Sequence, residues 1–76
     1  MAKEFSYEII KKVGTIGEKN SYSKEVNYIK FNSKEPVLDI RNWYNNGEEK
    51  QMLKGISLTN SEALELRNLL NTLELE

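Results

Sequence analysis

The stretch Asp39-Ile40-Arg41-Asn42-Trp43-Tyr44 alternates like a β-strand and decides how the rest of the chain is interpreted. Successive side chains of a strand point to opposite faces, so Asp39, Arg41 and Trp43 share one face of the expected sheet. The other face carries Leu38, Ile40 and the more ambiguous Tyr44, and we expect it to be the core. Because antiparallel sheets often leave one face open to water, the pattern favours an open face on which Trp43 stacks on bases and Arg41 contacts phosphate.

Patterned segments on both sides of this stretch predict three more strands. The four predicted strands cover residues 5–13, 22–32, 37–44 and 50–58. The polar residues 18–21 are typical of a loop, residues 33–36 of a connection ending in proline, and residues 45–47 of a tight turn. Neither alternate set of the second strand is purely apolar, which favours a bulge in that strand.

A helix is expected after the fourth strand. Thr59 and Glu62 have the spacing of a capping box, and Leu66, Leu69, Leu70 and Leu73 repeat at helical spacing. This stripe is expected to lie across one face of the sheet. The sequence therefore predicts one α+β domain over residues 1–76, with a four-stranded antiparallel sheet followed by one C-terminal helix, ββββα.

The length of the chain favours self-association. A domain of 76 residues buries only about 60 to 65% of its unfolded surface. The chain has no cysteine and no histidine, which excludes disulfides, Cys/His zinc sites and the commonest general base. Several apolar residues exceed what one thin core needs, so we expect a homodimer.

Charge is unevenly distributed although the net charge is only −1. Residues 1–58 carry a net charge of +2 and residues 59–76 carry −3. A mildly basic sheet beside an acidic helix would let one surface attract phosphate. The first four residues lead into patterned sequence without an apolar segment, so we expect neither a signal peptide nor a membrane span, and a cytoplasmic protein.

Candidate ligand-binding residues are aromatic and basic. Flat aromatic side chains that can stack on bases occur in the strand-like segments at Tyr22, Tyr28, Phe31, Trp43 and Tyr44. Lysines that can line a phosphate groove occur at Lys24, Lys30, Lys34, Lys50 and Lys54. Each group also has an explanation without a ligand. The aromatic residues can be ordinary core residues of strands, the lysines can be solvated surface residues, and Arg41 can form an ion pair with Asp39. No spacing of carboxylates, Gly-rich loop or Ser/base pair predicts an enzyme, a cofactor site or a metal site.

These residues resemble the positive cofactor four family of transcriptional coactivators, in its short bacterial form. The likeness lies in residues 38–41, the pair Trp43-Tyr44 and residues 54–58, and weaker similarity extends it over residues 22–70. The resemblance implies a homodimeric ββββα fold that binds single-stranded DNA with little sequence preference. Arg41 and Lys54 match phosphate-contacting positions, and Phe31 and Trp43 match stacking positions.

Other parts of the chain fit the family less closely. Lys30 and Lys34 lie near further basic positions of the family, and Tyr28 stands where related sequences can carry a basic residue. The chain lacks the Ser-rich and Lys-rich extension of the eukaryotic coactivators.

The sequence predicts a non-enzymatic, single-stranded nucleic-acid-binding homodimer. Its expected binding residues are Tyr22, Lys24, Tyr28, Lys30, Phe31, Lys34, Arg41, Trp43 and Lys54. The expected partner is single-stranded DNA in transcription, replication or repair. The transcription machinery is a further candidate partner, and the expected location is the cytoplasm, in association with the nucleoid. DNA versus RNA stays open, because stacking and phosphate contacts do not read the sugar. The alternative is a dimeric protein-interaction module that binds no nucleic acid.

Overall fold

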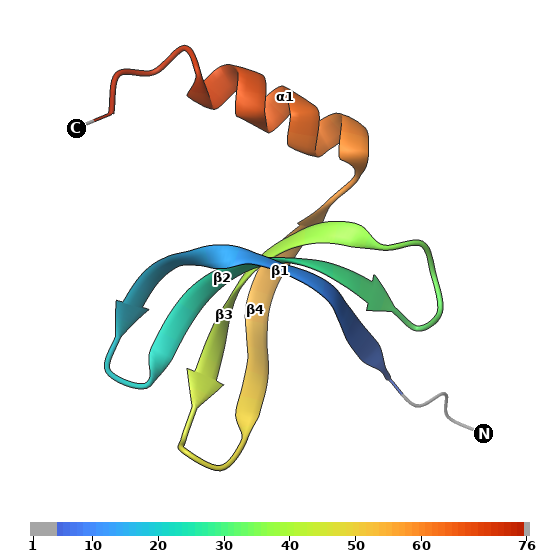
Figure 1. Ribbon diagram of the computed structural model, residues 1–76, viewed down its shortest axis with the longest axis vertical. Helices are drawn as coiled ribbons and strands as arrows, with labels where there is room; N and C mark the ends of the chain where they lie inside the picture. The colour runs from blue at the N-terminus through green and yellow to red at the C-terminus, as the bar shows by residue number, and fades with distance from the viewer. Residues whose placement is uncertain (1–4, 76) are drawn as a thin grey trace.

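Four antiparallel strands followed by one helix make up the computed structural model, which describes residues 5–75 (Figure 1). The elements are β1 (Tyr7–Lys19), β2 (Tyr22–Phe31), β3 (Val37–Asn45), β4 (Lys50–Leu58) and α1 (Asn60–Leu70). Each strand pairs with its neighbour in sequence, in the order β1-β2-β3-β4. The predicted ββββα architecture is confirmed, and the expectation for residues 1–4 lies outside the described residues.

β1 is longer and less regular than predicted. It continues to Lys19 through Gly14 and Gly17, because its pairing with β2 shifts register at three places. Each shift inserts one extra residue into β1, and these residues are Ile10, Val13 and Ile16, all exposed. The predicted bulge is therefore not in β2 but in its neighbour. Bulges increase the twist of a strand, so three of them bend the sheet strongly.

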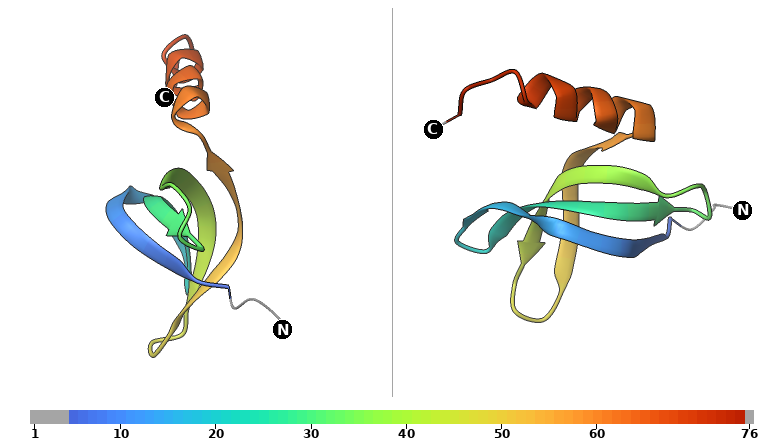
Figure 2. Two further views of the ribbon diagram at one scale, coloured as in Figure 1. Left: turned by 90° about the vertical axis from the view of Figure 1, so that its right-hand side faces the viewer. Right: turned by 45° about the horizontal axis from the view of Figure 1, so that its top comes forward.

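The sheet curls so far that its inner face encloses a small core (Figure 2). Tyr7 at the start of β1 reaches across to Trp43 near the end of β3, with ring centroids 5.8 Å apart. Ile29 and Trp43 are fully buried, and the polar Asn27 and Asp39 are buried beside them. All of these side chains lie on one face, because their strand positions alternate in step across the paired strands.

The curl reverses the predicted assignment of the two faces. The face of Asp39, Arg41 and Trp43, expected to be open to water, is the inside of the sheet. Leu38 and Ile40, expected in the core, lie partly exposed on the outside. The large apolar area of the indole favours its burial, and the carboxylate and guanidinium are buried as a neutral, hydrogen-bonded pair.

Asp39 and Arg41 form the polar centre of this inner face. Arg41 donates to both Asp39 oxygens, from Nε at 2.5 Å and from Nη2 at 2.6 Å. Its Nη1 donates to the Leu53 carbonyl at 2.9 Å, and Ser57 Oγ donates to Asp39 at 2.9 Å. These bonds join β3 to β4 and satisfy the buried charges, which is the condition under which burial of an ion pair is tolerated.

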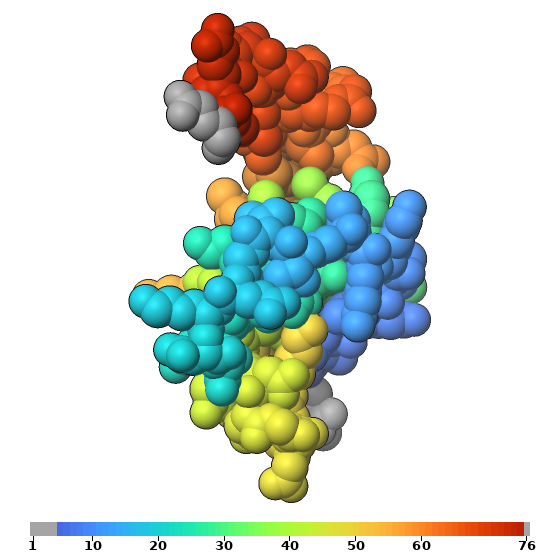
Figure 3. Space-filling model, turned by 60° about the vertical axis from the view of Figure 1, so that its left-hand side comes forward, coloured from blue at the N-terminus to red at the C-terminus, as the bar shows by residue number. Residues whose placement is uncertain are grey.

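α1 begins as predicted but does not lie across the sheet. The Thr59 hydroxyl accepts from the Glu62 amide at 3.2 Å, and the Glu62 carboxylate accepts from the Thr59 amide at 2.9 Å, which confirms the capping box. The Tyr28 hydroxyl donates to the Asn60 side chain. Beyond this start the helix projects away from the sheet on a narrow connection, and it buries none of its residues (Figure 3).

The predicted docking of the leucine stripe on the sheet is therefore wrong. Leu69, Leu70 and Leu73 are exposed, and among the described residues the helix lies near β3 and β4 alone, apart from the bond between Tyr28 and Asn60. An apolar stripe that this chain does not cover needs a second surface to be buried. Over residues 5–75 the structure shows no helix that is both long and apolar enough to cross a bilayer.

Gly55 is required by the close approach of Arg41. A Cβ built at Gly55 would lie 2.0 Å from Arg41 Cβ and 2.7 Å from the Ile40 carbonyl oxygen. We expect Gly55→Ala to lower the free energy of unfolding by about 3 kcal/mol, since both obstacles are rigid parts of β3. Urea unfolding followed by circular dichroism measures this change.

Gly17→Ala is the matched control, because a Cβ at Gly17 meets no atom within 4 Å. This variant should unfold within about 1 kcal/mol of the natural chain. Equal stability of the two alanine variants would contradict the argument that Gly55 makes room for Arg41.

Candidate nucleic-acid interface

Aromatic and basic side chains gather on the outer face of the sheet, at the end where both hairpins turn. Residues that pair across neighbouring strands form two rows there. The first row is Lys19, Tyr22, Tyr44 and Gln51, and the second is Gly17, Lys24 and Asn42 with the β4 residues Leu53 and Lys54 beside Asn42. We call these two rows the Tyr22 surface.

Tyr22 is the exposed aromatic of this surface. Its side chain is 51% exposed and packs on Tyr44, with ring centroids 5.1 Å apart at an interplanar angle of 51°. The partner ring holds Tyr22 in place while leaving part of it open to solvent. A base can stack on such a ring at a gain of about 1 to 3 kcal/mol.

Two hollows flank Tyr22 and bring lysines to it. One, of about 590 Å³, is lined by Lys19, Asn42 and Lys54, and the other, of about 510 Å³, by Lys19, Asn42 and Lys24. Three lysines therefore line the hollows beside one exposed ring. A shallow basic groove with an aromatic floor is the arrangement that tracks a single-stranded backbone.

A bulge in β4 positions Lys54 in this surface. Arg41 pairs with Gly55 but Trp43 pairs with Met52, so β4 contains one residue more than β3 between these pairs. Leu53 and Lys54 consequently both line the hollow beside Tyr22. Leu53 adds an apolar side chain to the lining of this hollow, and Lys54 adds a positive charge.

Three predicted site residues, Tyr22, Lys24 and Lys54, meet on the Tyr22 surface. The other lysines lie elsewhere: Lys30 is at the opposite end of β2, and Lys34 is in the β2–β3 connection. Tyr28 lies half-buried on the outer face, where its hydroxyl is bonded to Asn60 at the start of the helix.

The remaining predicted residues, Arg41, Trp43 and Phe31, lie on the inner face, and the expectation of an open stacking face around Trp43 is wrong. Trp43 has no exposed surface, and the Arg41 side chain is only 13% exposed with all three nitrogens bonded inside the protein. Phe31 is half-buried with the Arg41 guanidinium 5.4 Å from its ring centre. The curl of the sheet turns these groups inward, and three of the five N–H donors of Arg41 are used inside the protein.

Lys19 and Asn42 belong to the Tyr22 surface but were not predicted. Lys19 was assigned to a loop, because Gly14 and Gly17 suggested that the first strand ends earlier. Asn42 lies between Arg41 and Trp43, and its position opposite Lys24 follows only from the strand register. The one available signal was the alternation of β3, which places Asn42 and Tyr44 on the same face.

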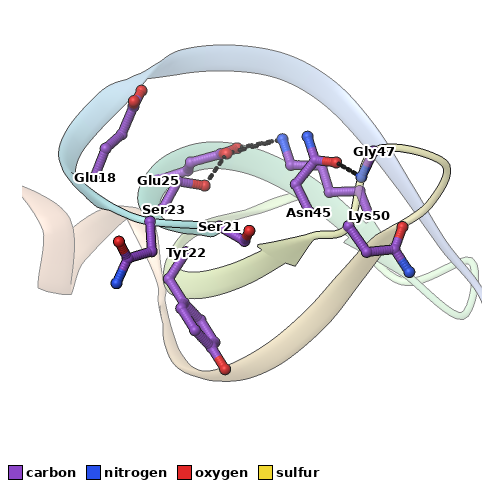
Figure 4. A pocket seen from close by; sticks show the side chains of 10 residues that line it. Glu18, Ser21, Tyr22, Ser23, Glu25, Asn45, Gly47 and Lys50 are labelled. Carbon is purple, nitrogen blue, oxygen red and sulfur yellow. Dashed lines mark hydrogen bonds and ion pairs between the residues drawn. The ribbon is translucent and has the colours of Figure 1, made fainter.

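A polar hollow of about 590 Å³ lies between the two hairpin loops, next to Tyr22 (Figure 4). The Asn45 amide donates to the Ser21 carbonyl at 2.8 Å and ties the loops together. Glu25 faces this hollow and accepts from Lys50 Nζ at 2.8 Å and from Ser23 Oγ at 2.6 Å. Burial raises the pKa of the Glu25 carboxyl, but hydrogen bonds from Lys50 and Ser23, the positive charge of Lys50 and a weaker interaction with the Asn27 amide together lower it more, and the net pKa lies below the usual value of 4.5.

Lys50 also lies 5.3 Å from the centre of the Trp43 ring, so its ammonium is held by a carboxylate and an indole together. Among residues 5–75 no group of three or more acidic, histidine or cysteine side chains is placed to hold a metal ion. The arrangement as a whole offers stacking, positive charge and hydrogen bonds.

Comparison with known proteins agrees with this chemistry. Residues 19–69 match the family model described as Transcriptional Coactivator p15 (PC4). The chain is also similar to an uncharacterized protein of Treponema pallidum (strain Nichols), with 35% identity over 74 residues, which cover 96% of this chain and 85% of that protein. The family match begins at Lys19, so it includes the whole Tyr22 surface apart from Gly17.

The lowered pKa of Glu25 predicts acid sensitivity. A group whose pKa is lower in the folded state stabilises the fold above its unfolded pKa and loses that contribution as the pH falls through the folded value. We expect the free energy of unfolding to fall as the pH drops below 4.5, and to fall less in Glu25→Gln. Urea unfolding at a series of pH values measures both slopes.

Glu48→Gln is the control for removing one negative charge, because Glu48 lies exposed in the β3–β4 loop. Its acid dependence should match that of the natural chain. An acid dependence in Glu25→Gln as steep as in the natural chain would show that the Glu25–Lys50 pair does not stabilise the fold.

Proposed function

The chain belongs to the Transcriptional Coactivator p15 (PC4) family, and we propose that it is a sequence-tolerant single-stranded DNA-binding protein that acts as a homodimer in transcription, replication or repair. The family is one of nucleic-acid-binding coactivators rather than enzymes. The proposal covers residues 1–76 as one binding domain located in the cytoplasm with the nucleoid.

The observation that carries the proposal is the exposed ring of Tyr22 among three lysines. Stacking on a π-face is independent of base identity, and ammonium groups attract phosphate at any sequence. Lys19, Lys24 and Lys54 supply this charge on the same face as the ring. Trp43 and Arg41 support the site from the inside instead of touching the ligand, since they lie on the inner face of the strand whose outer face carries Tyr44.

The uncovered apolar surface supports the homodimer. Val26, Ile40 and Ile56 form a cross-strand row on the outer face next to the Tyr22 surface, and Ile56 is 57% exposed. Leu64, Leu69 and Leu70 of α1, which follows the end of β4, are similarly exposed. A second copy of the chain would bury both apolar surfaces and extend the small core that one copy makes.

Tyr22→Ala should weaken binding of a labelled single-stranded oligonucleotide by about 1 to 3 kcal/mol, because one stacking platform is lost. The fold should persist, since the Tyr22 side chain is half-exposed and lies outside the buried core. Fluorescence anisotropy titrations at several salt concentrations measure the affinity, and parallel titrations with duplex DNA and RNA give the preference.

Two lysine variants serve as a matched pair in the same titrations. If three lysines neutralise phosphates, log affinity should fall with log salt at a slope near −2, and Lys54→Gln should reduce the slope by about 0.7. Lys34→Gln, at the far end of β2, should leave it unchanged. Binding without salt dependence, or equal effects of both variants, would contradict the proposed surface, and affinity for a protein alone would favour the protein-interaction alternative.

Ile56→Lys should convert the dimer to a monomer, because a charge would be buried in the proposed interface. Sedimentation equilibrium gives the mass, to be compared with 8.9 kDa for one chain. Val13→Lys, which changes an equally exposed apolar residue on β1, is the control and should stay dimeric. A natural chain that sediments at the mass of one chain at all concentrations would refute the homodimer.

A further inference from the structure

Asn27 is a buried amide with an unused hydrogen-bond donor. The residue is 1% exposed, and its Nδ2 makes no hydrogen bond of good geometry among the described residues 5–75, although the amide contributes weakly to the lowered pKa of the neighbouring Glu25 carboxyl. A buried donor without a partner costs about 1 to 3 kcal/mol, so such groups are rare unless something fills the place. An acceptor from outside the chain would complete the hydrogen bonding of this amide.

The amide borders a hollow that is large enough for more than a water molecule. This hollow, of about 170 Å³, lies on the inner side of the sheet between β1 and β2 and is lined by Lys12, Thr15, Glu25, Asn27 and Lys50, with the backbone at Val13 and Gly14. One water takes up only about 30 Å³ in the liquid. The β1 bulge at Val13, where the pairing with β2 shifts between Lys12 and Gly14, lies in the wall of this space.

The polar groups of the hollow alternate as donor, acceptor and donor. Glu25 is the acceptor, and its lowered pKa keeps it ionised at neutral pH. Lys50 Nζ donates to it at 2.8 Å from β4, and Asn27 lies two residues further along β2 on the same face. The carboxylate therefore lies between an ammonium donor and an amide donor.

We propose that this hollow binds the edge of a thymine or uracil base from the strand held on the Tyr22 surface. The imide edge of these two bases presents a carbonyl, an N–H and a second carbonyl, which complements Asn27, Glu25 and Lys50 in that order. Cytosine and adenine present an amino group beside an unprotonated ring nitrogen, so the amino group faces the Asn27 donor and the ring nitrogen faces the Glu25 carboxylate without a proton between them. Guanine presents two adjacent N–H groups and leaves the second opposite an ammonium.

A path connects the hollow to the Tyr22 surface. The larger hollow between the hairpin loops is lined by Tyr22 on one side and by Glu25 and Lys50 on the other (Figure 4). Glu25 and Lys50 also line the small hollow, so the two spaces meet at this ion pair. When one base of a DNA single strand stacks on Tyr22, a neighbouring base can reach Asn27 by way of the hollow between the hairpin loops. The inference thus rests on the proposed function and adds a base preference to it.

The test compares labelled oligo-dT, oligo-dC and oligo-dA of equal length in anisotropy titrations with the natural chain. We expect oligo-dT to bind about fivefold or more tightly than the other two, the discrimination of one good two-point base contact. Oligo-dT carrying N3-methylthymine should bind like oligo-dC, because the methyl group replaces the N–H that Glu25 accepts. This measurement needs no variant and cannot be confused with misfolding.

Asn27→Leu removes the amide at similar volume. We expect it to reduce the affinity ratio of oligo-dT to oligo-dC to about one and to leave oligo-dC binding unchanged, which also reports that the fold is intact. Equal binding of all oligonucleotides by the natural chain, or a full preference in Asn27→Leu, overturns the inference and assigns the hollow to water alone. Failure of every oligonucleotide to bind would instead refute the proposed function, so the two failures are distinguishable.

Discussion

The buried pair of Asp39 and Arg41 is the constraint on which the rest of the structure depends. Taking two charges out of water is favourable only where geometry and further hydrogen bonds compensate for lost hydration. The pair meets this condition through the Leu53 carbonyl and the Ser57 hydroxyl, both of which belong to β4. The pair therefore fixes how β3 and β4 meet, and the absence of a side chain at Gly55 is the steric condition for it.

Fixing charges inside the sheet has consequences for its outside. The inner face is small and contains polar groups, so two apolar side chains are fully buried there among the described residues, Ile29 and Trp43. Further apolar side chains on β1, at Ile56 on the outer face and along the helix are left in water by this chain alone. A monomer of this shape has a weak hydrophobic driving force, and the same outer face that stays open for a second copy also carries the Tyr22 surface at its other end.

Local signals in the sequence predicted the strands and the helix, whereas which face of the sheet is buried depends on the three-dimensional curl of the sheet. The capping box of Thr59 and the turn at Gly47 depend on neighbouring residues only, and both occur where predicted. Alternation in β3 correctly showed which side chains share a face, but period two cannot tell which face becomes the inside. The curl that decides this comes from bulges in β1, and exposed residues such as Val13 gave an apolar pattern that imitated a buried strand.

The outer face divides into two ends with different chemistry, and the division follows strand register. Near the helix the paired residues are aliphatic, as in the row of Val26, Ile40 and Ile56, while two rows further on they are aromatic and basic around Tyr22. In the proposed homodimer a partner copy that covered the aliphatic end would leave the hairpin end free, so the proposed assembly and the proposed ligand binding would not compete for one surface. Both ends belong to the same four strands, so a base bound near the loops and a second copy bound near the helix would contact one continuous hydrogen-bonded sheet. Within that sheet the Glu25–Lys50 ion pair links β2 to β4 beside the Tyr22 surface.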